Sequence, residues 1–134
     1  MSLLADTSVW SLALRRDVPQ LVPDVVALGY ALERGQRVFV TGLILQELLQ
    51  GFSGPKARDQ IIARLSALPL LMPELQDHIE AAELRNQCRR SGVQIETVDA
   101  LLAQLCIRHD LTMLATDKDF AFIARHSALK LWKA

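Results

Sequence analysis

Short apolar segments alternate with longer segments of helical periodicity along this chain, and this alternation limits the folds open to it. The clearest strand candidates are "SLLAD" (2–6), "RVFVT" (37–41) and "LTMLAT" (111–116). Their length and their apolar or β-branched residues predict buried strands. Strands joined through helices require crossover connections, which favour a mostly parallel sheet with helices on both faces. We therefore predict an α/β fold.

The 134 residues contain no linker, repeat or low-complexity tract, so we expect one domain over residues 1–134. "LPLLM" (68–72) and "LKLWK" (129–133) are further strand candidates, which brings the sheet to four or five strands; flanking prolines weaken the first of them. The helices that we predict are a short one from Ser8, then 23–34, 43–52, 56–67, 74–91 and 97–109, and a short one after Asp117.

Acidic residues follow the predicted strands. Asp6 comes directly after the first strand, and Asp117 after the strand at 111–116, with Asp119 two residues further on. Glu47 lies in the helix after the second strand, and Asp99 lies near the start of a helix. Sites in parallel α/β sheets lie beyond the carboxyl ends of the strands, where helix N-termini also gather. We therefore expect these carboxylates to meet at one edge of the sheet.

Such a group of carboxylates requires a cation. At about 4 Å and an effective dielectric near 20, each like-charged pair costs roughly 4 kcal/mol. Hard oxygen ligands with open coordination positions suit Mg²⁺, with Mn²⁺ as a substitute. The sequence therefore predicts a metal site held by Asp6, Glu47, Asp99 and Asp117, with Asp119 as a fifth acid.

Each acid also has a simpler explanation when it is considered alone. Asp99 in "TVDALLAQL" (97–105) shares a helix face with Leu102 and Cys106, opposite Gln104 and Arg108. It could be a helix-start residue beside a Thr97 cap. Glu47 could belong to a solvated helix face, and "TDKDF" (116–120) could be a turn with a helix cap. The five positions together favour the metal site.

Hydroxyl groups flank two of these acids. Thr7 and Ser8 follow Asp6, where they could cap the helix or hold a water on the metal, and Thr116 could orient Asp117. The three histidines show no metal-ligand spacing. Cys88 and Cys106 make neither a disulfide framework nor a Cys-x-x-Cys site, so we expect both in the core.

Composition adds weaker constraints. Fifteen basic residues balance fifteen acidic ones, which argues mildly against a nucleic-acid partner unless a metal neutralises some of the acids. No apolar run reaches 18 residues, and the N-terminus lacks the features of a signal peptide. Together with the two isolated cysteines, these features predict a cytoplasmic protein with no membrane span.

Four segments resemble those of a PIN-domain ribonuclease, and more narrowly those of a VapC-type toxin of a type II toxin–antitoxin system. They cover nearly the whole chain, in the expected order: "LLADTSVW" (3–10), "LILQELLQG" (43–51), "TVDALLAQL" (97–105) and "LTMLATDKDF" (111–120). The resemblance places the acids of the family on the same residues, namely Asp6, Glu47, Asp99 and Asp117, with Asp119 as a possible fifth, and its hydroxyl on Thr7 or Ser8.

The resemblance implies a Mg²⁺-dependent endoribonuclease that cleaves phosphodiester bonds with a metal-activated water. It also implies a VapB-like antitoxin, which binds through a hydrophobic helix and inserts a basic group near the acids, and a homodimer. The segments 43–52 and 56–68 are candidate walls of the antitoxin groove. Arg85, Arg89 and Arg90 could hold the RNA backbone or form a solvated helix face.

Two other classes of protein compete with this interpretation. A catalytically inert PIN-like interaction module would not need the full set of acids. A receiver-type signalling domain also binds Mg²⁺, but it requires paired acids after the first strand and an aspartate after the third. Here a single acid follows the first strand, and "LPLLMPEL" (68–75) contains no aspartate. The sequence identifies neither the RNA, nor its cleavage site, nor the number of metal ions.

Overall fold

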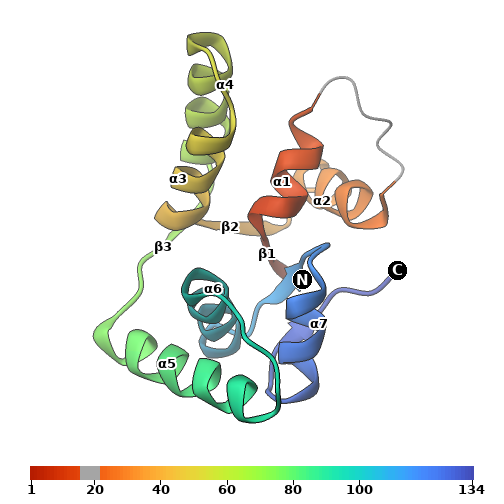
Figure 1. Cartoon of the computed structure of the whole chain (residues 1–134). Helices are drawn as coiled ribbons and strands as arrows, with labels where there is room; N and C mark the ends of the chain where they lie inside the picture. The colour runs from red at the N-terminus through yellow and green to blue at the C-terminus, as the bar shows by residue number, and fades with distance from the viewer. Residues whose placement is uncertain (16–21) are drawn as a thin grey trace.

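A parallel sheet forms the centre of the molecule. The structure is a computed structural model that describes residues 1–15 and 22–134 (Figure 1). In this part of the chain the sheet has five strands in the order β3-β2-β1-β4-β5, and every neighbouring pair is parallel. The strands are β1 (Ser2–Ala5), β2 (Arg37–Thr41), β3 (Leu70–Leu71), β4 (Thr112–Leu114) and β5 (Lys130–Leu131). The predicted α/β fold is confirmed, and the two weaker strand candidates are the short edge strands.

Helices cover both faces of the sheet. Figure 1 shows α1 to α4 on one side of the strands and α5 to α7 on the other. Each described helix begins and ends within about one residue of its predicted limits where those were given. The helices are α1 (Thr7–Ala13), α2 (Pro23–Glu33), α3 (Gly42–Gly51), α4 (Pro55–Ser66), α5 (Leu75–Arg90), α6 (Thr97–Arg108) and α7 (Lys118–Arg125).

Local sequence explains where several helices begin and end. The Thr41 hydroxyl accepts the N–H of Ile44 at 3.1 Å and caps α3. Pro23 and Pro55 occupy first-turn positions, where a missing N–H costs nothing. Helix α5 ends before Gly92, whose φ of 89° suits glycine, and the N–H of Val93 returns to the carbonyl of Cys88.

The hydrophobic core lies between the central strands and the two helix layers. Leu4 of β1 and Met113 of β4 are completely buried, as are Leu102 and Leu105 of α6. Cys88 and Cys106 are buried as free thiols in the same core. Because β1 and β4 each pair with a strand on both sides, the sheet determines where their carboxyl ends and the residues that follow them lie. Within the described residues, no helix combines the length and apolarity that crossing a bilayer requires.

Candidate metal centre

Asp6 links the end of β1 to the start of α1. It is 6% exposed, and its Oδ2 accepts hydrogen bonds from the Ser8 hydroxyl at 2.8 Å and from the Ser8 N–H at 3.3 Å. Burial raises the pKa of Asp6, the bonds from Ser8 oppose that rise, and the charge of Asp117 adds to it. Asp6 therefore caps α1 and also interacts electrostatically with Asp117, which lies 111 positions further along the chain.

Glu47 approaches from α3. It is half-buried, and its Oε1 accepts the Thr7 hydroxyl at 2.7 Å. This bond joins α1 to α3 at the carboxyl edge of the sheet. Thr7 and Ser8, which the sequence left as alternatives, thus have separate partners, since Thr7 orients Glu47 whereas Ser8 orients Asp6.

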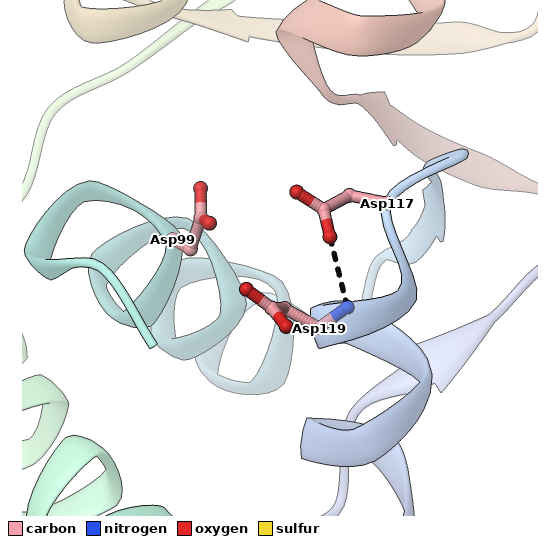
Figure 2. Close-up of side chains that lie close together, drawn as sticks. All are labelled: Asp99, Asp117 and Asp119. Atoms are coloured by element: carbon pink, nitrogen blue, oxygen red, sulfur yellow. Dashed lines mark hydrogen bonds between the residues drawn. The ribbon is translucent and has the colours of Figure 1, made fainter. Parts of the chain in front are cut away.

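Three further acids converge from α6 and α7. Figure 2 shows Asp99, Asp117 and Asp119 directed toward a common space, and one carboxylate oxygen from each lies within 4.8 Å of the others. Asp117 caps α7, because its Oδ1 accepts the N–H of Asp119 at 2.9 Å. Asp119, the possible fifth acid of the sequence analysis, belongs to this group because its carboxylate oxygen lies at the same spacing. Among the described residues, Asp6 and Glu47 are not part of the group at that spacing.

Electrostatics connect all of these acids. Burial, followed by the charges of Asp6, Asp117, Glu96 and Glu47, raises the pKa of Asp99 from 3.8 to about 7. Burial, followed by the charges of Asp117 and Glu96, also raises the pKa of Asp119. The acids on α1, α3, α6 and α7 therefore share one region of negative potential at the carboxyl edge, where the sequence predicted that they would meet.

The donor set fits a hard divalent cation. Every candidate ligand is a carboxylate oxygen. Mg²⁺ and Mn²⁺ prefer such hard oxygen ligands, whereas softer metals favour nitrogen and sulfur. Burial and then the neighbouring acids raise the pKa of Asp99, and a bound cation would favour its ionised form. Asp99, Asp117 and Asp119 are the side chains placed to bind it together, with Asp6 and Glu47 beside them.

One detail of the predicted site is corrected. Thr97 does not cap α6, because the helix begins at Thr97 itself and Glu96 occupies the N-cap without a side-chain cap bond. Gln104 of the same helix is 7% exposed, and its Nε2 donates to Glu80 Oε2 at 2.5 Å. The simpler explanation of Asp99 therefore loses its capping partner.

Two acids were missed by the sequence analysis. Glu96 precedes α6 and contributes to the potential on Asp99 and Asp119. Asp24, in the first turn of α2, accepts the N–H of Ala115 on its Oδ2 at 3.2 Å. Both stand at helix starts, the signal that placed Asp99 at this edge. That signal gives the position of a residue but not the direction of its side chain.

The remaining predicted residues lie around this centre. The N–H of Thr116 donates to the Ser8 hydroxyl at 3.3 Å, and a role for the Thr116 hydroxyl stays a prediction.

Arg85 donates from Nε to the carbonyl of Ile95 at 2.8 Å, and Arg89 donates to Asn86. Arg85 also lines a groove of about 450 Å³ between α5, α6 and the start of α3. Contact of these arginines or Arg90 with RNA stays a prediction.

Comparisons with known proteins agree with this architecture. The PIN domain model matches residues 3–126. The chain is 28% identical over 130 residues to "VapC ribonuclease Mb1587" of Mycobacterium bovis and to "Ribonuclease VapC11" of Mycobacterium tuberculosis, covering 96% of each chain in both comparisons. It superposes on VapBC2 from Rickettsia felis, solved with a DNA fragment from its promoter, with a TM-score of 0.73 and 20% identity over 98% of both chains. This last likeness concerns the fold.

Proposed function

Because the chain belongs to the PIN domain family, we propose that it is a metal-dependent endoribonuclease and the toxin of a toxin–antitoxin pair. The observation that carries the proposal is the convergence of Asp99, Asp117 and Asp119, together with the pKa of about 7 at Asp99. The similarity to proteins named VapC ribonucleases supports the RNA substrate.

The chain's own residues have distinct tasks in this mechanism. Asp99, Asp117 and Asp119 would hold the ion, and Asp6 and Glu47 would add to the negative potential around it. A divalent cation held by these residues would supply Lewis-acid chemistry for phosphodiester hydrolysis, namely activation of water and stabilisation of the leaving oxygen. Ser8 and Thr7 keep the Asp6 and Glu47 carboxylates in fixed orientations, so that little rearrangement is needed when substrate arrives.

Asp99 also stores a proton in the metal-free site. With a pKa of about 7, its carboxyl is partly protonated at neutral pH, and cation binding would displace that proton. Metal affinity should therefore increase as the pH rises through 7. Arg85, Arg89 and Arg90, near the carboxyl end of α5, remain the candidates for contact with the RNA backbone.

A VapB-like antitoxin is the partner that this function requires, and the structure of VapBC2 supports the assignment. The predicted walls 43–52 and 56–68 correspond to α3 and α4. A groove of about 380 Å³ runs between α1, α2 and α4; Gln60 and Arg64 of α4 line it, whereas α3 does not contribute to its lining, so the wall in α3 stays a prediction. Trp10 also lines it, and within the described residues its Nε1 is the one buried side-chain polar atom without a hydrogen-bond partner. A backbone carbonyl of a bound helix or its flanking segment could accept that N–H.

The two rival classes fare differently. Receiver domains have the strand order 2-1-3-4-5, whereas this sheet has the order 3-2-1-4-5, so the receiver alternative has no support from the fold. An inert interaction module shares the present fold, and only activity separates it from a nuclease.

Purified protein incubated with RNA in Mg²⁺, Mn²⁺ or EDTA makes that separation. We expect cleavage with either metal and none in EDTA. Absence of cleavage of total cellular RNA by folded protein in both metals would favour the inert module. Sequencing RNA ends after brief induction in cells would then identify the RNA and its cleavage site.

A further inference from the structure

The segment that connects β4 to α7 carries Asp117, and three backbone groups fix it. The carbonyl of Leu114 accepts the N–H of Asp6 at 2.8 Å, and the N–H of Thr116 donates to the Ser8 hydroxyl at 3.3 Å. Between them, the N–H of Ala115 donates to Asp24 Oδ2 at 3.2 Å. Two of the three contacts come from the β1–α1 junction, which belongs to the site itself. The third comes from outside it.

Asp24 reaches this segment from α2. It stands in the first turn of that helix, directly after Pro23, and it is half-buried. Negative charge at a helix N-terminus is favourable by itself, so the simplest role of Asp24 is to stabilise α2. That role does not require contact with a residue 91 positions away in the chain. The hydrogen bond to Ala115 therefore adds a second role, because it links α2 to the segment that carries a candidate metal ligand.

We propose that Asp24 is a positioning residue for the metal centre, acting through the Ala115 N–H on Asp117. The inference rests on the proposed function. Asp117 lies two residues beyond Ala115, and its neighbour Asp119 depends on it in turn through the N-cap bond of α7. Ligand sites depend on tight placement of their side chains, and loss of an outer hydrogen-bond partner typically lowers metal affinity about 10- to 100-fold.

The test compares Asp24→Ala with Asp24→Asn. Alanine removes the acceptor, whereas asparagine removes the charge but keeps a side-chain oxygen in the same place. Glu33→Ala is the control, since Glu33 is an exposed acid at the other end of the same helix. For each variant, Mn²⁺ affinity is measured by calorimetry, hydrogen exchange of the Ala115 amide by NMR, and RNA cleavage as kcat and KM.

We expect Asp24→Ala to weaken Mn²⁺ binding roughly tenfold, at the lower end of the usual range for outer partners, and to accelerate exchange of the Ala115 amide. Asp24→Asn should recover most of both properties, and Glu33→Ala should change neither. The loss in RNA cleavage at subsaturating Mn²⁺ should follow the loss in metal affinity, with KM for RNA unchanged.

Several results would overturn the inference. If Asp24→Ala binds Mn²⁺ with wild-type affinity, the proposed metal function stands, but Asp24 does not position the metal centre. Equal damage in the alanine and asparagine variants would show that charge, rather than the acceptor, is responsible. If Asp24→Ala does not fold, Asp24→Asn decides, since a tenfold loss of affinity with a protected Ala115 amide contradicts the proposal. Failure of the wild-type protein to bind Mn²⁺ would instead refute the proposed function, and this inference with it.

Discussion

Asp99 stands in the first turn of α6, where a carboxylate usually does no more than stabilise the helix dipole. Here its surroundings oppose its ionisation, because burial and four neighbouring acids raise its pKa to about 7. In the unfolded chain the same carboxyl titrates near 3.8. Between those two pH values the folded protein binds more protons than the unfolded chain, so folding is favoured by acid within this range.

The first prediction concerns pH. In EDTA, the contribution of Asp99 makes the free energy of unfolding decrease as the pH rises from about 4 to about 7, and level off above that. Asp99→Asn should reduce this slope and raise the metal-free melting temperature at pH 8. Denaturant unfolding of both proteins at several pH values measures the effect. An identical pH dependence in the variant would contradict the assigned environment of Asp99.

The second prediction concerns metal. Mn²⁺ or Mg²⁺ should stabilise the wild-type fold, by about 2.7 kcal/mol at one hundred times the dissociation constant. Asp99→Asn should bind the cation more weakly and show a smaller metal-induced rise in melting temperature. If Asp99 only supports the helix start, asparagine should serve equally well and leave the metal response unchanged. Thermal unfolding with and without Mn²⁺ distinguishes these outcomes.

Individual residues also show what sequence alone could and could not predict. Asp6 and Asp117 were predictable, because residues that follow parallel strands reach one edge of the sheet. The direction of Asp24 was not, since the rule that places helix starts at this edge does not say whether a carboxylate faces a metal or a backbone N–H. The separate partners of Thr7 and Ser8 likewise depend on how α1 packs against α3.

At the level of elements, α6 is held in place by α5. Asp77 is completely buried and binds Arg108 through two hydrogen bonds, from Nε at 2.6 Å and from Nη2 at 2.8 Å. Burial raises the pKa of Asp77, but the hydrogen bonds from Arg108 and from the Glu74 N–H, together with the charges of Arg108 and His109, leave the pKa below its usual value. Gln104 and Glu80 form a second link between the helices. These contacts fix the axis of the helix that carries Asp99.

The third prediction follows from that pair. Arg108→Ala leaves the Asp77 carboxylate buried without its partner, which is strongly destabilising, and we expect the melting temperature to fall by roughly 10 °C. Lys130→Ala is the matched control, because it breaks an exposed ion pair with Asp110 and should have little effect. Calorimetry of both variants measures the difference. Equal melting temperatures would show that the pair does not anchor α6.

The sequence pattern placed Arg108 and Gln104 on the side of α6 opposite Leu102 and Cys106, but it did not show what covers that side. The structure buries Gln104 against α5, and Arg108, although exposed, binds the buried Asp77 of α5. The reason is that α5 is itself polar along this side, so polar side chains satisfy one another across a helix pair. Helical periodicity identifies a polar face, but it does not reveal whether water or another polar helix covers it.

At the level of the whole molecule, exposed apolar surface supports the predicted homodimer. Leu70, Met72, Leu75 and Ile79 lie on β3, the start of α5 and the segment between them, and Leu75 is 77% exposed. Large exposed apolar side chains that are close together indicate an association surface. The fourth prediction is a dimer mass by light scattering at micromolar concentration. A monomer mass, with and without the partner protein, would refute it.

The fifth prediction concerns the antitoxin. Expression of this protein alone should slow cell growth, and co-expression of a small partner encoded beside it should restore growth. The physical reason is that a bound helix with a basic group near the acids would block both the substrate and the proposed metal centre. Normal growth in cells that contain abundant folded protein able to cleave RNA would contradict the role as a toxin.

The cleavage rate of Asp99→Asn beside that of the wild-type protein tests the metal-dependent nuclease most directly. Both proteins are incubated in excess over one RNA in Mg²⁺, with parallel reactions in EDTA and circular dichroism to confirm that each is folded. We predict that the wild-type protein cleaves only with metal, and that Asp99→Asn is folded but does not cleave. If the folded variant cleaves at the wild-type rate, Asp99 is a helix-start residue and the metal centre described above is wrong.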